Sequence, residues 1–170
     1  MSAPTARDTG DGRLRVSPVS TPAQQDISMT PHSEILFIDP AVDDIGTLLN
    51  GLRPEVKAFV LDPARPAARQ MARLLEGRGK LDAVHVIAHG APGRISFGGG
   101  DWTTDTLENE AEDLGRIGLA LAEGGGLRLW SCYAGAGDEG QAFVEGMRLA
   151  AGATGGGVSI SRFSWRSTGW

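Results

Sequence analysis

The chain has 170 residues, of which 41% are hydrophobic and 22% charged, and its formal net charge is −5 at pH 7. The length suits a single domain, and the composition is that of a soluble globular protein with enough apolar side chains for a core. A negative net charge argues against nucleic acid as a partner, because binding a polyanion draws on a basic surface. The opening residues hold no apolar run of export-signal or membrane-spanning length, so we expect no membrane insertion and, by default, a cytoplasmic protein.

The first part of the chain differs in composition from the rest. Residues 1–32 are rich in Ser, Thr, Pro and Gly and contain no aromatic side chain. Such a segment cannot bury enough apolar surface to offset the entropy lost on ordering it. We therefore expect a flexible N-terminal lead over residues 1–32 and one α/β domain over residues 33–170.

Apolar runs alternate with helical patterns through the rest of the chain. Runs rich in β-branched and aromatic residues predict strands at 34–38, 56–61, 83–88, 127–130 and near 158–160. Apolar residues at helical spacing predict helices over 42–49, 67–75, 107–121 and about 138–150. Short runs at 94–97 and 101–103 flank three glycines and predict a small hairpin after the third strand. This order predicts a three-layer α/β sandwich with a mainly parallel central sheet.

Two of the predicted strands are followed by residues that can do chemistry. His89 and Gly90 follow the third strand, and Ser131 and Cys132 follow the fourth. Ligands of parallel α/β sheets bind beyond the carboxyl ends of the strands, so neighbouring strands would place a thiol and an imidazole at one cleft. A thiolate attacks a carbonyl, an imidazole protonates the leaving amine, and backbone N–H groups stabilise the oxyanion. These are the groups that amide hydrolysis requires.

Each of these residues also has a plain structural interpretation. A lone cysteine is more often a small buried hydrophobe, and a histidine at the end of a strand can simply cap a turn. The place of Cys132 at the end of a strand and ahead of a helix favours a reactive thiol. His85 lies within the third strand, where we expect it to be packed or hydrogen-bonded to a neighbouring loop.

The two strand ends resemble those of a known superfamily. An apolar strand ending in His-Gly (84–90), then a helix and a second apolar strand ending in a small residue and Cys (127–132), is similar to the caspase-like, or clan CD, cysteine peptidases. Within that group the chain most resembles an uncharacterised bacterial domain family found near the N-termini of large surface or adhesin-like proteins, which opens with a segment like residues 35–40. The resemblance covers residues 33–160.

The resemblance assigns roles to individual residues. It implies that Cys132 is the nucleophile, that His89 is the general acid and base, and that the backbone N–H groups of Gly90 and Cys132 bind the oxyanion. It implies a polypeptide substrate and no cofactor. It leaves open self-processing, a larger parent assembly, and non-classical secretion or surface association.

Other motifs in the chain point to different chemistry. Residues 135–140 match the dinucleotide fingerprint G-x-G-x-x-G, but no acidic residue follows Glu145 where a ribose partner is expected. His85 and His89 are four residues apart on a strand-like segment that lacks the further ligands of a zinc site, so we expect no metal. Asp138 and Glu139 begin a predicted helix and could face a basic substrate side chain, with Trp165 as an apolar wall.

The leading hypothesis is a cysteine endopeptidase that acts through a Cys132/His89 dyad. The alternative is a non-catalytic interaction or targeting module of a surface-associated protein that keeps the fold, and a nucleotide-binding domain is a third possibility. Alkylation separates the first two, because a catalytic thiol reacts quickly near neutral pH whereas a buried thiol resists until the protein unfolds.

Overall fold

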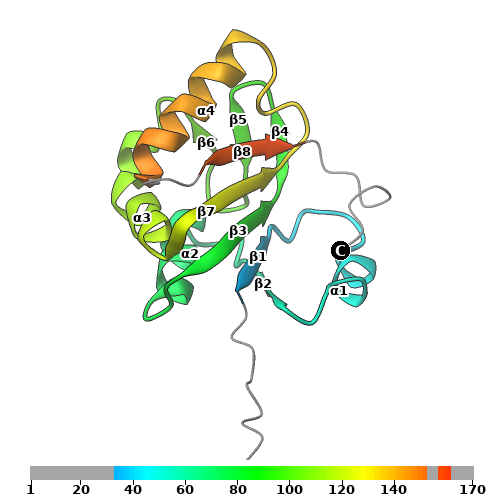
Figure 1. Cartoon of the computed structure of the whole chain (residues 1–170). Coiled ribbons are helices and arrows are strands. Elements are labelled where there is room, and N and C mark those ends of the chain that lie inside the picture. Colours follow the sequence, from blue (N-terminus) through cyan, green and yellow to red (C-terminus); the bar gives the residue numbers. More distant parts are fainter. Residues whose placement is uncertain (1–32, 153–156, 162–170) are drawn as a thin grey trace, which may run out of the picture.

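The computed structural model describes residues 33–152 and 157–161, which form three layers (Figure 1). The middle layer is a five-stranded sheet in the order β2-β1-β3-β7-β8, and each neighbouring pair of its strands is parallel. This arrangement confirms the predicted three-layer α/β sandwich with a mainly parallel sheet. The expected N-terminal lead over residues 1–32, and Trp165, lie outside the described residues.

The described elements follow the predicted alternation of strands and helices. The strands of the main sheet are β1 (Glu34–Ile38), β2 (Val56–Val60), β3 (Leu81–Ile87), β7 (Leu121–Trp130) and β8 (Val158–Ser161). The helices are α1 (Ile45–Asn50), α2 (Ala67–Leu75), α3 (Leu107–Leu119) and α4 (Gly137–Ala151). A small antiparallel sheet contains β4 (His89–Ala91), β5 (Arg94–Ser96) and β6 (Trp102–Thr103).

Alternate residues of the main strands face two separate cores. On β1, Ile35 and Phe37 pack into the larger core, together with apolar residues of α2, α3 and α4. Leu36 and Ile38 point the other way and pack with apolar residues of and around α1. Successive side chains of a strand point to opposite faces, so a strand covered on both faces reads as a continuous apolar run. Figure 1 shows α2, α3 and α4 on one side of the sheet and α1 on the other.

Two boundaries differ from the sequence expectation. The predicted helix over 107–121 ends at Leu119, and Leu121 instead pairs with Leu81 at the start of β7. The N–H of Leu81 donates to the carbonyl of Ala120 (3.0 Å), so the chain enters the sheet two residues before the expected end of the helix. The predicted hairpin gains a third strand, because residues 89–91 pair with β5.

No helix within 33–152 is long and apolar enough to cross a membrane.

Candidate active site

The carboxyl ends of β3 and β7 bring the histidine and cysteine segments side by side. The two strands are neighbours, with Ile87 opposite Trp130 in the sheet. Just beyond them, the N–H of Ala88 donates to the carbonyl of Trp130 (3.3 Å). His89 then begins β4 and Cys132 begins the turn after β7, and both residues are exposed to solvent. The exposure of Cys132 removes the interpretation of this cysteine as a buried hydrophobe.

Gly90 makes the closest approach between the two segments. A β-carbon at this position would overlap the Oγ of Ser131 and lie 3.1 Å from the carbonyl oxygen of Cys132. A second link lies further along, where the N–H of Gly93 donates to the carbonyl of Ala134 (3.0 Å). Only glycine allows the backbone of the histidine segment to approach the cysteine segment so closely.

The imidazole of His89 is oriented by a main-chain carbonyl. Its Nε2 lies 3.0 Å from the carbonyl oxygen of Ala41, in the turn after β1. A carbonyl oxygen only accepts hydrogen bonds, so Nε2 carries the proton and, in the neutral ring, Nδ1 holds the lone pair. His89 therefore stands at the end of β3 between the turns after β1 and β7, with Nδ1 as its basic nitrogen.

A buried carboxylate holds the turn that contains Ala41. Asp39 is only 2% exposed. Its Oδ1 accepts the N–H of Ala41 (2.9 Å), and its Oδ2 accepts the N–H of Gly98 in the loop between β5 and β6 (3.1 Å). The backbone N–H of Asp39 donates to the carbonyl of Ile87 (2.9 Å). Asp39 thus ties the turn after β1 both to the small sheet and to the end of β3, which fixes the carbonyl that orients His89.

Asp39 and Ala41 are functional candidates that the sequence interpretation missed. The sequence showed Asp39 only as the first residue of an Asp-Pro pair that closes a strand. The local sequence does not single out Asp39, since the same Asp-Pro-Ala triplet follows β2 at residues 62–64. There the Oδ1 of Asp62 accepts the N–H of Ala64 (2.9 Å), the same local turn on an exposed surface. Burial and the added bond to Gly98 distinguish Asp39, and neither is visible in the sequence.

The residues on either side of Cys132 have unusual environments. Ser131 is 2% exposed, and its Oγ has no hydrogen-bond partner within the residues that the structure describes. Tyr133 has a φ of 59°, in the left-handed region that non-glycine residues rarely adopt. Unsatisfied buried groups and left-handed non-glycine residues each cost about 1–3 kcal/mol and cluster at functional sites. Both features therefore favour a functional role for the turn that carries Cys132.

His85 belongs to the sheet interior rather than to the exposed site. Its ring is 1% exposed, and its Nδ1 accepts a hydrogen bond from the indole Nε1 of Trp130 (3.0 Å). Its Nε2 lies 3.0 Å from the carboxylate of Glu34, to which it donates. These partners lie on β7 and β1, so the expected hydrogen bond to a loop is replaced by contacts between strands. The bond from Trp130 leaves Nδ1 without a proton and holds His85 in its neutral form.

The electrostatics of this buried pair predict how its stability varies with pH. Burial lowers the pKa of His85, although Glu34 opposes the shift. Burial would raise the pKa of Glu34, but its hydrogen bonds and its attraction to His85 and Arg53 outweigh that effect and lower it. Below about pH 6.5 His85 becomes protonated in the unfolded chain but stays neutral in the folded protein, so the free energy of unfolding falls as the pH is lowered. Glu34 contributes a further loss of the same sign below about pH 4.5.

The residues suggested for substrate binding lie at the start of α4. Asp138 and Glu139 are both exposed in its first turn. A β-carbon at Gly93 would lie 3.1 Å from the Cβ of Glu139, so Glu139 adjoins the turn between β4 and β5. Trp165 cannot be placed, because it lies outside the described residues. Among those residues, no group of three or more His, Cys, Asp or Glu side chains is arranged to hold a metal ion.

One comparison with known proteins gives a match. A family model described as "Domain of unknown function (DUF4347)" matches residues 35–157, a span that begins in β1 and ends just before β8 and so contains His89, Cys132 and Asp39. No curated protein and no solved structure shows a significant match to this chain.

Proposed function

The chain belongs to the family described as domain of unknown function (DUF4347), and from its site we propose that it is a caspase-like cysteine peptidase. In this proposal Cys132 is the nucleophile and His89 is the general acid and base. The substrate is a polypeptide, and no cofactor takes part.

One observation carries the proposal. The backbones of the His89-Gly90 and Ser131-Cys132 segments pack against each other at the carboxyl ends of two adjacent parallel strands. This is the edge at which α/β sheets place their ligand sites. The two segments carry exposed side chains with complementary chemistry, the imidazole of His89 and the thiol of Cys132. The Ala41 carbonyl supports the assignment further, because it leaves Nδ1 as the nitrogen that exchanges protons.

The proposed reaction proceeds in two steps. The imidazole of His89 takes the thiol proton, and the sulfur of Cys132 attacks the peptide carbonyl to form a tetrahedral oxyanion. The C–N bond then breaks as His89 returns the proton to the leaving amine, which leaves a thioester on Cys132. In the second step His89 takes a proton from water, the hydroxide attacks the thioester, and the released sulfur is reprotonated. The products are a free amine and a carboxylate.

Backbone geometry supports Gly90 as an oxyanion donor. Ala91 and Arg94 flank a two-residue turn, and Gly90 pairs with Ile95. Hydrogen-bonded and non-hydrogen-bonded pairs alternate along an antiparallel ladder, and the pair that closes a two-residue turn is hydrogen-bonded. The Gly90–Ile95 pair is then the non-hydrogen-bonded kind, which leaves the N–H of Gly90 directed away from β5. Together with the N–H of Cys132 it would receive the oxyanion.

A fluorogenic peptide library with every amino acid varied next to the scissile bond tests the proposal. We expect hydrolysis by the unmodified chain and loss of at least about 10³-fold in Cys132→Ala and His89→Ala, since each removes a group that reacts. Both substituted side chains are exposed, so both variants should melt near the temperature of the unmodified protein. Unchanged cleavage by either purified variant would refute the dyad.

The same library addresses substrate preference. If Asp138 and Glu139 face the substrate, cleavage after Arg or Lys should dominate and should fall in Asp138→Asn or Glu139→Gln. A preference for Asp or Glu would instead rule out an acidic pocket.

The non-catalytic interaction module remains the competing function. Timed alkylation of Cys132 with iodoacetamide near pH 7 distinguishes the two, with His89→Ala as the comparison protein. A catalytic thiol should react faster than free cysteine and should slow markedly in His89→Ala. Equal rates in both proteins, with no hydrolysis of any peptide, would favour the interaction module.

A further inference from the structure

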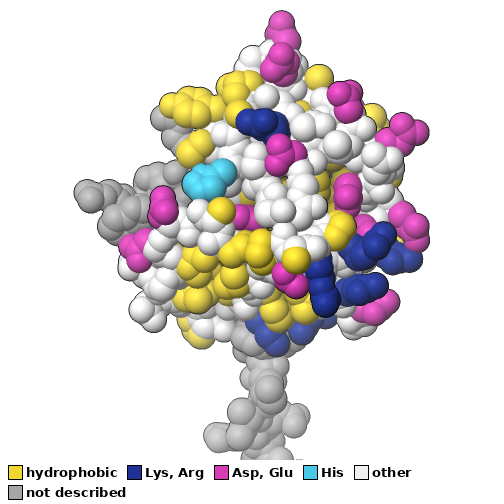
Figure 2. All heavy atoms as spheres, turned by 180° about the vertical axis from the view of Figure 1, so that it is seen from behind, with side chains coloured by type: hydrophobic (Ala, Val, Ile, Leu, Met, Phe, Trp, Pro, Cys, Tyr) yellow, Lys and Arg dark blue, Asp and Glu magenta, His cyan; other side chains and the backbone are white. Residues whose placement is uncertain are grey.

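A second candidate binding site lies on the surface of α2, away from Cys132 and His89. A groove of about 470 Å³ is lined by Arg65, Arg69 and Arg73, with Pro66, Gln70 and Leu74 between them. Arg69 and Arg73 are four residues apart and lie on one face of α2, and Arg65 extends this stripe from the turn before the helix, since all three line the same groove. Figure 2 shows the basic side chains of that face gathered mainly on one side, in a molecule whose net charge is negative. The groove is therefore a local positive surface on an acidic protein.

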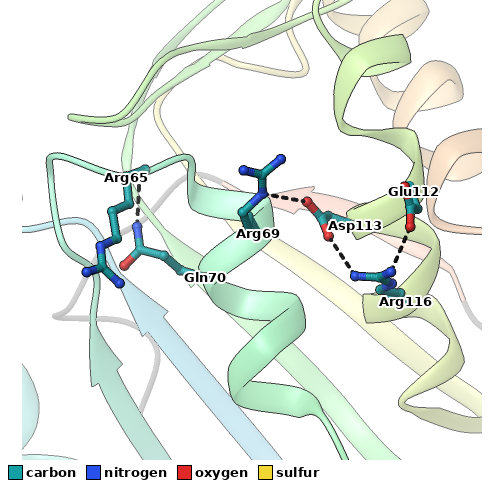
Figure 3. Close-up of polar contacts among 6 residues, drawn as sticks. All are labelled: Arg65, Arg69, Gln70, Glu112, Asp113 and Arg116. Atoms are coloured by element: carbon teal, nitrogen blue, oxygen red, sulfur yellow. Dashed lines mark hydrogen bonds and ion pairs between the residues drawn. The ribbon is translucent and has the colours of Figure 1, made fainter.

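Hydrogen bonds fix the backbone turn before α2, at one end of this groove. The side-chain amide of Gln70 donates to the carbonyls of Asp62 (2.9 Å) and Arg65 (3.0 Å), and its oxygen accepts the N–H of Asp62 (2.8 Å). A β-carbon at Gly99 would overlap the carbonyl of Arg65, so the loop between β5 and β6 packs against the same turn. Figure 3 shows Gln70 and Arg65 joined at one end of the stripe. The backbone that carries the first arginine is thus fixed before any ligand arrives.

The guanidinium groups of the three arginines have nitrogen atoms available to bind a ligand. The ion pairs of Arg65 with Asp62 (3.3 Å) and of Arg69 with Asp113 (3.7 Å) both use the Nε atom, and the two arginine side chains are 65% and 61% exposed. The Asp113 carboxylate is shared with Arg116 (3.4 Å), as Figure 3 shows. Arg73 has no ion-pair partner within residues 33–152. The terminal Nη forks of Arg65 and Arg69, and the whole guanidinium of Arg73, can bind an external anion.

We propose that this groove binds an acidic peptide segment of a partner polypeptide in an extended conformation. Four residues of an α-helix rise about 6 Å, which sets the spacing between Arg69 and Arg73 on α2. Alternate side chains of an extended chain are spaced about 6.6 Å apart and point the same way. Carboxylates at every second position of a peptide therefore match the stripe, and a guanidinium fork pairs with a carboxylate bidentately. The exposed Leu74 (37%) offers an apolar contact beside the charges.

A long polyanion fits this surface less well than a short acidic peptide. The arginines lie beside Asp62, Asp113 and the exposed Glu76, and the whole chain carries a charge of −5. These negative charges repel a nucleic acid that extends past the groove, whereas a peptide segment of a few residues contacts only the arginine stripe. The inference is independent of the proposed peptidase activity, because it uses none of the groups around Cys132.

Fluorescence anisotropy with a labelled eight-residue peptide of alternating Glu and Ala tests the proposal. We expect saturable binding to the full chain, weakened about tenfold in the double variant Arg69→Gln/Arg73→Gln and less in Arg73→Gln alone. Arg148→Gln is the matched control, since it removes one exposed positive charge from α4, where Arg148 pairs, among the residues that the structure describes, only with Glu145 (2.7 Å). It should change the dissociation constant less than twofold, and Cys132→Ala should not change it.

Several outcomes would overturn the proposal. Equal weakening by Arg148→Gln would reduce the binding to general charge attraction. Equal affinity for a peptide with Gln in place of Glu would show that the carboxylates are not what the groove recognises. Tighter, arginine-dependent binding of a single-stranded oligonucleotide of the same charge would reassign the groove to phosphates. Failure to bind any of these probes would remove the site. Arg69→Lys keeps the charge without the fork, so full affinity in that variant would refute bidentate recognition.

Discussion

The Asp39→Ala variant removes a buried carboxylate that accepts two backbone hydrogen bonds, from Ala41 (2.9 Å) and Gly98 (3.1 Å). A hydrogen bond to a charged group contributes about 1.5–3 kcal/mol to the free energy of unfolding. Ala41 and Gly98 are themselves exposed, so water can reach their N–H groups once the carboxylate is gone. The lower end of the range then applies to each bond, and we expect a loss of about 3 kcal/mol. Asp39→Asn keeps one acceptor oxygen and should lose about half of that.

The chain contains a matched control in Asp62, which forms the same local turn with Ala64 (2.9 Å). Asp62 is exposed, and its ion pair with Arg65 is between exposed side chains, so Asp62→Ala should cost about 1 kcal/mol or less. Urea unfolding monitored by circular dichroism gives both free energies, and equal slopes in urea would show that both variants unfold from equally compact states.

A second measurement tests the effect on His89. Its ring is held with the proton on Nε2 by the Ala41 carbonyl (3.0 Å), and Asp39 fixes that carbonyl. Nitrogen-15 shifts of the imidazole should report one tautomer in the unmodified protein and in Asp62→Ala, and a mixture in Asp39→Ala. If Asp39→Ala is no less stable than Asp62→Ala, or if the His89 tautomer does not change, the positioning role of Asp39 is wrong.

Two further predictions concern packing and pH. Gly90→Ala places a methyl group into the Oγ of Ser131 and 2.9 Å from the carbonyl of Arg94, so it should lower the free energy of unfolding by about 1–3 kcal/mol. Gly46→Ala makes the same change in open space on α1. It should raise the free energy of unfolding by up to about 1 kcal/mol in the same urea assay. The unmodified protein should lose thermal stability as the pH falls from about 6.5 toward 5, because the lowered pKa of His85 keeps that ring neutral when folded. His85→Gln should flatten this dependence, whereas equally steep melting curves against pH would contradict it.

Part of the candidate site could be read from the chain because strand ends are local features. His89 and Cys132 each follow an apolar run, and the parallel topology implied by the order of elements places such ends at one edge of the sheet. Asp39 and Ala41 escaped notice because a main-chain carbonyl has no sequence signature and because Asp39 resembles Asp62 in its local sequence. The difference between the two aspartates arises only when Gly98, 59 residues away, reaches the buried carboxylate.

The sequence by itself determined the kinds of elements and their order, because apolar periodicity and turn residues act over a few neighbours. It therefore predicted the parallel sheet and the helical layers, and it placed an imidazole and a thiol at strand ends. Only the tertiary structure decided which strands are adjacent, that His85 is enclosed between Glu34 and Trp130, and that Gly90 presses against Ser131. Burial, tautomer and close contact depend on groups that are distant along the chain, and packing alone brings those groups together.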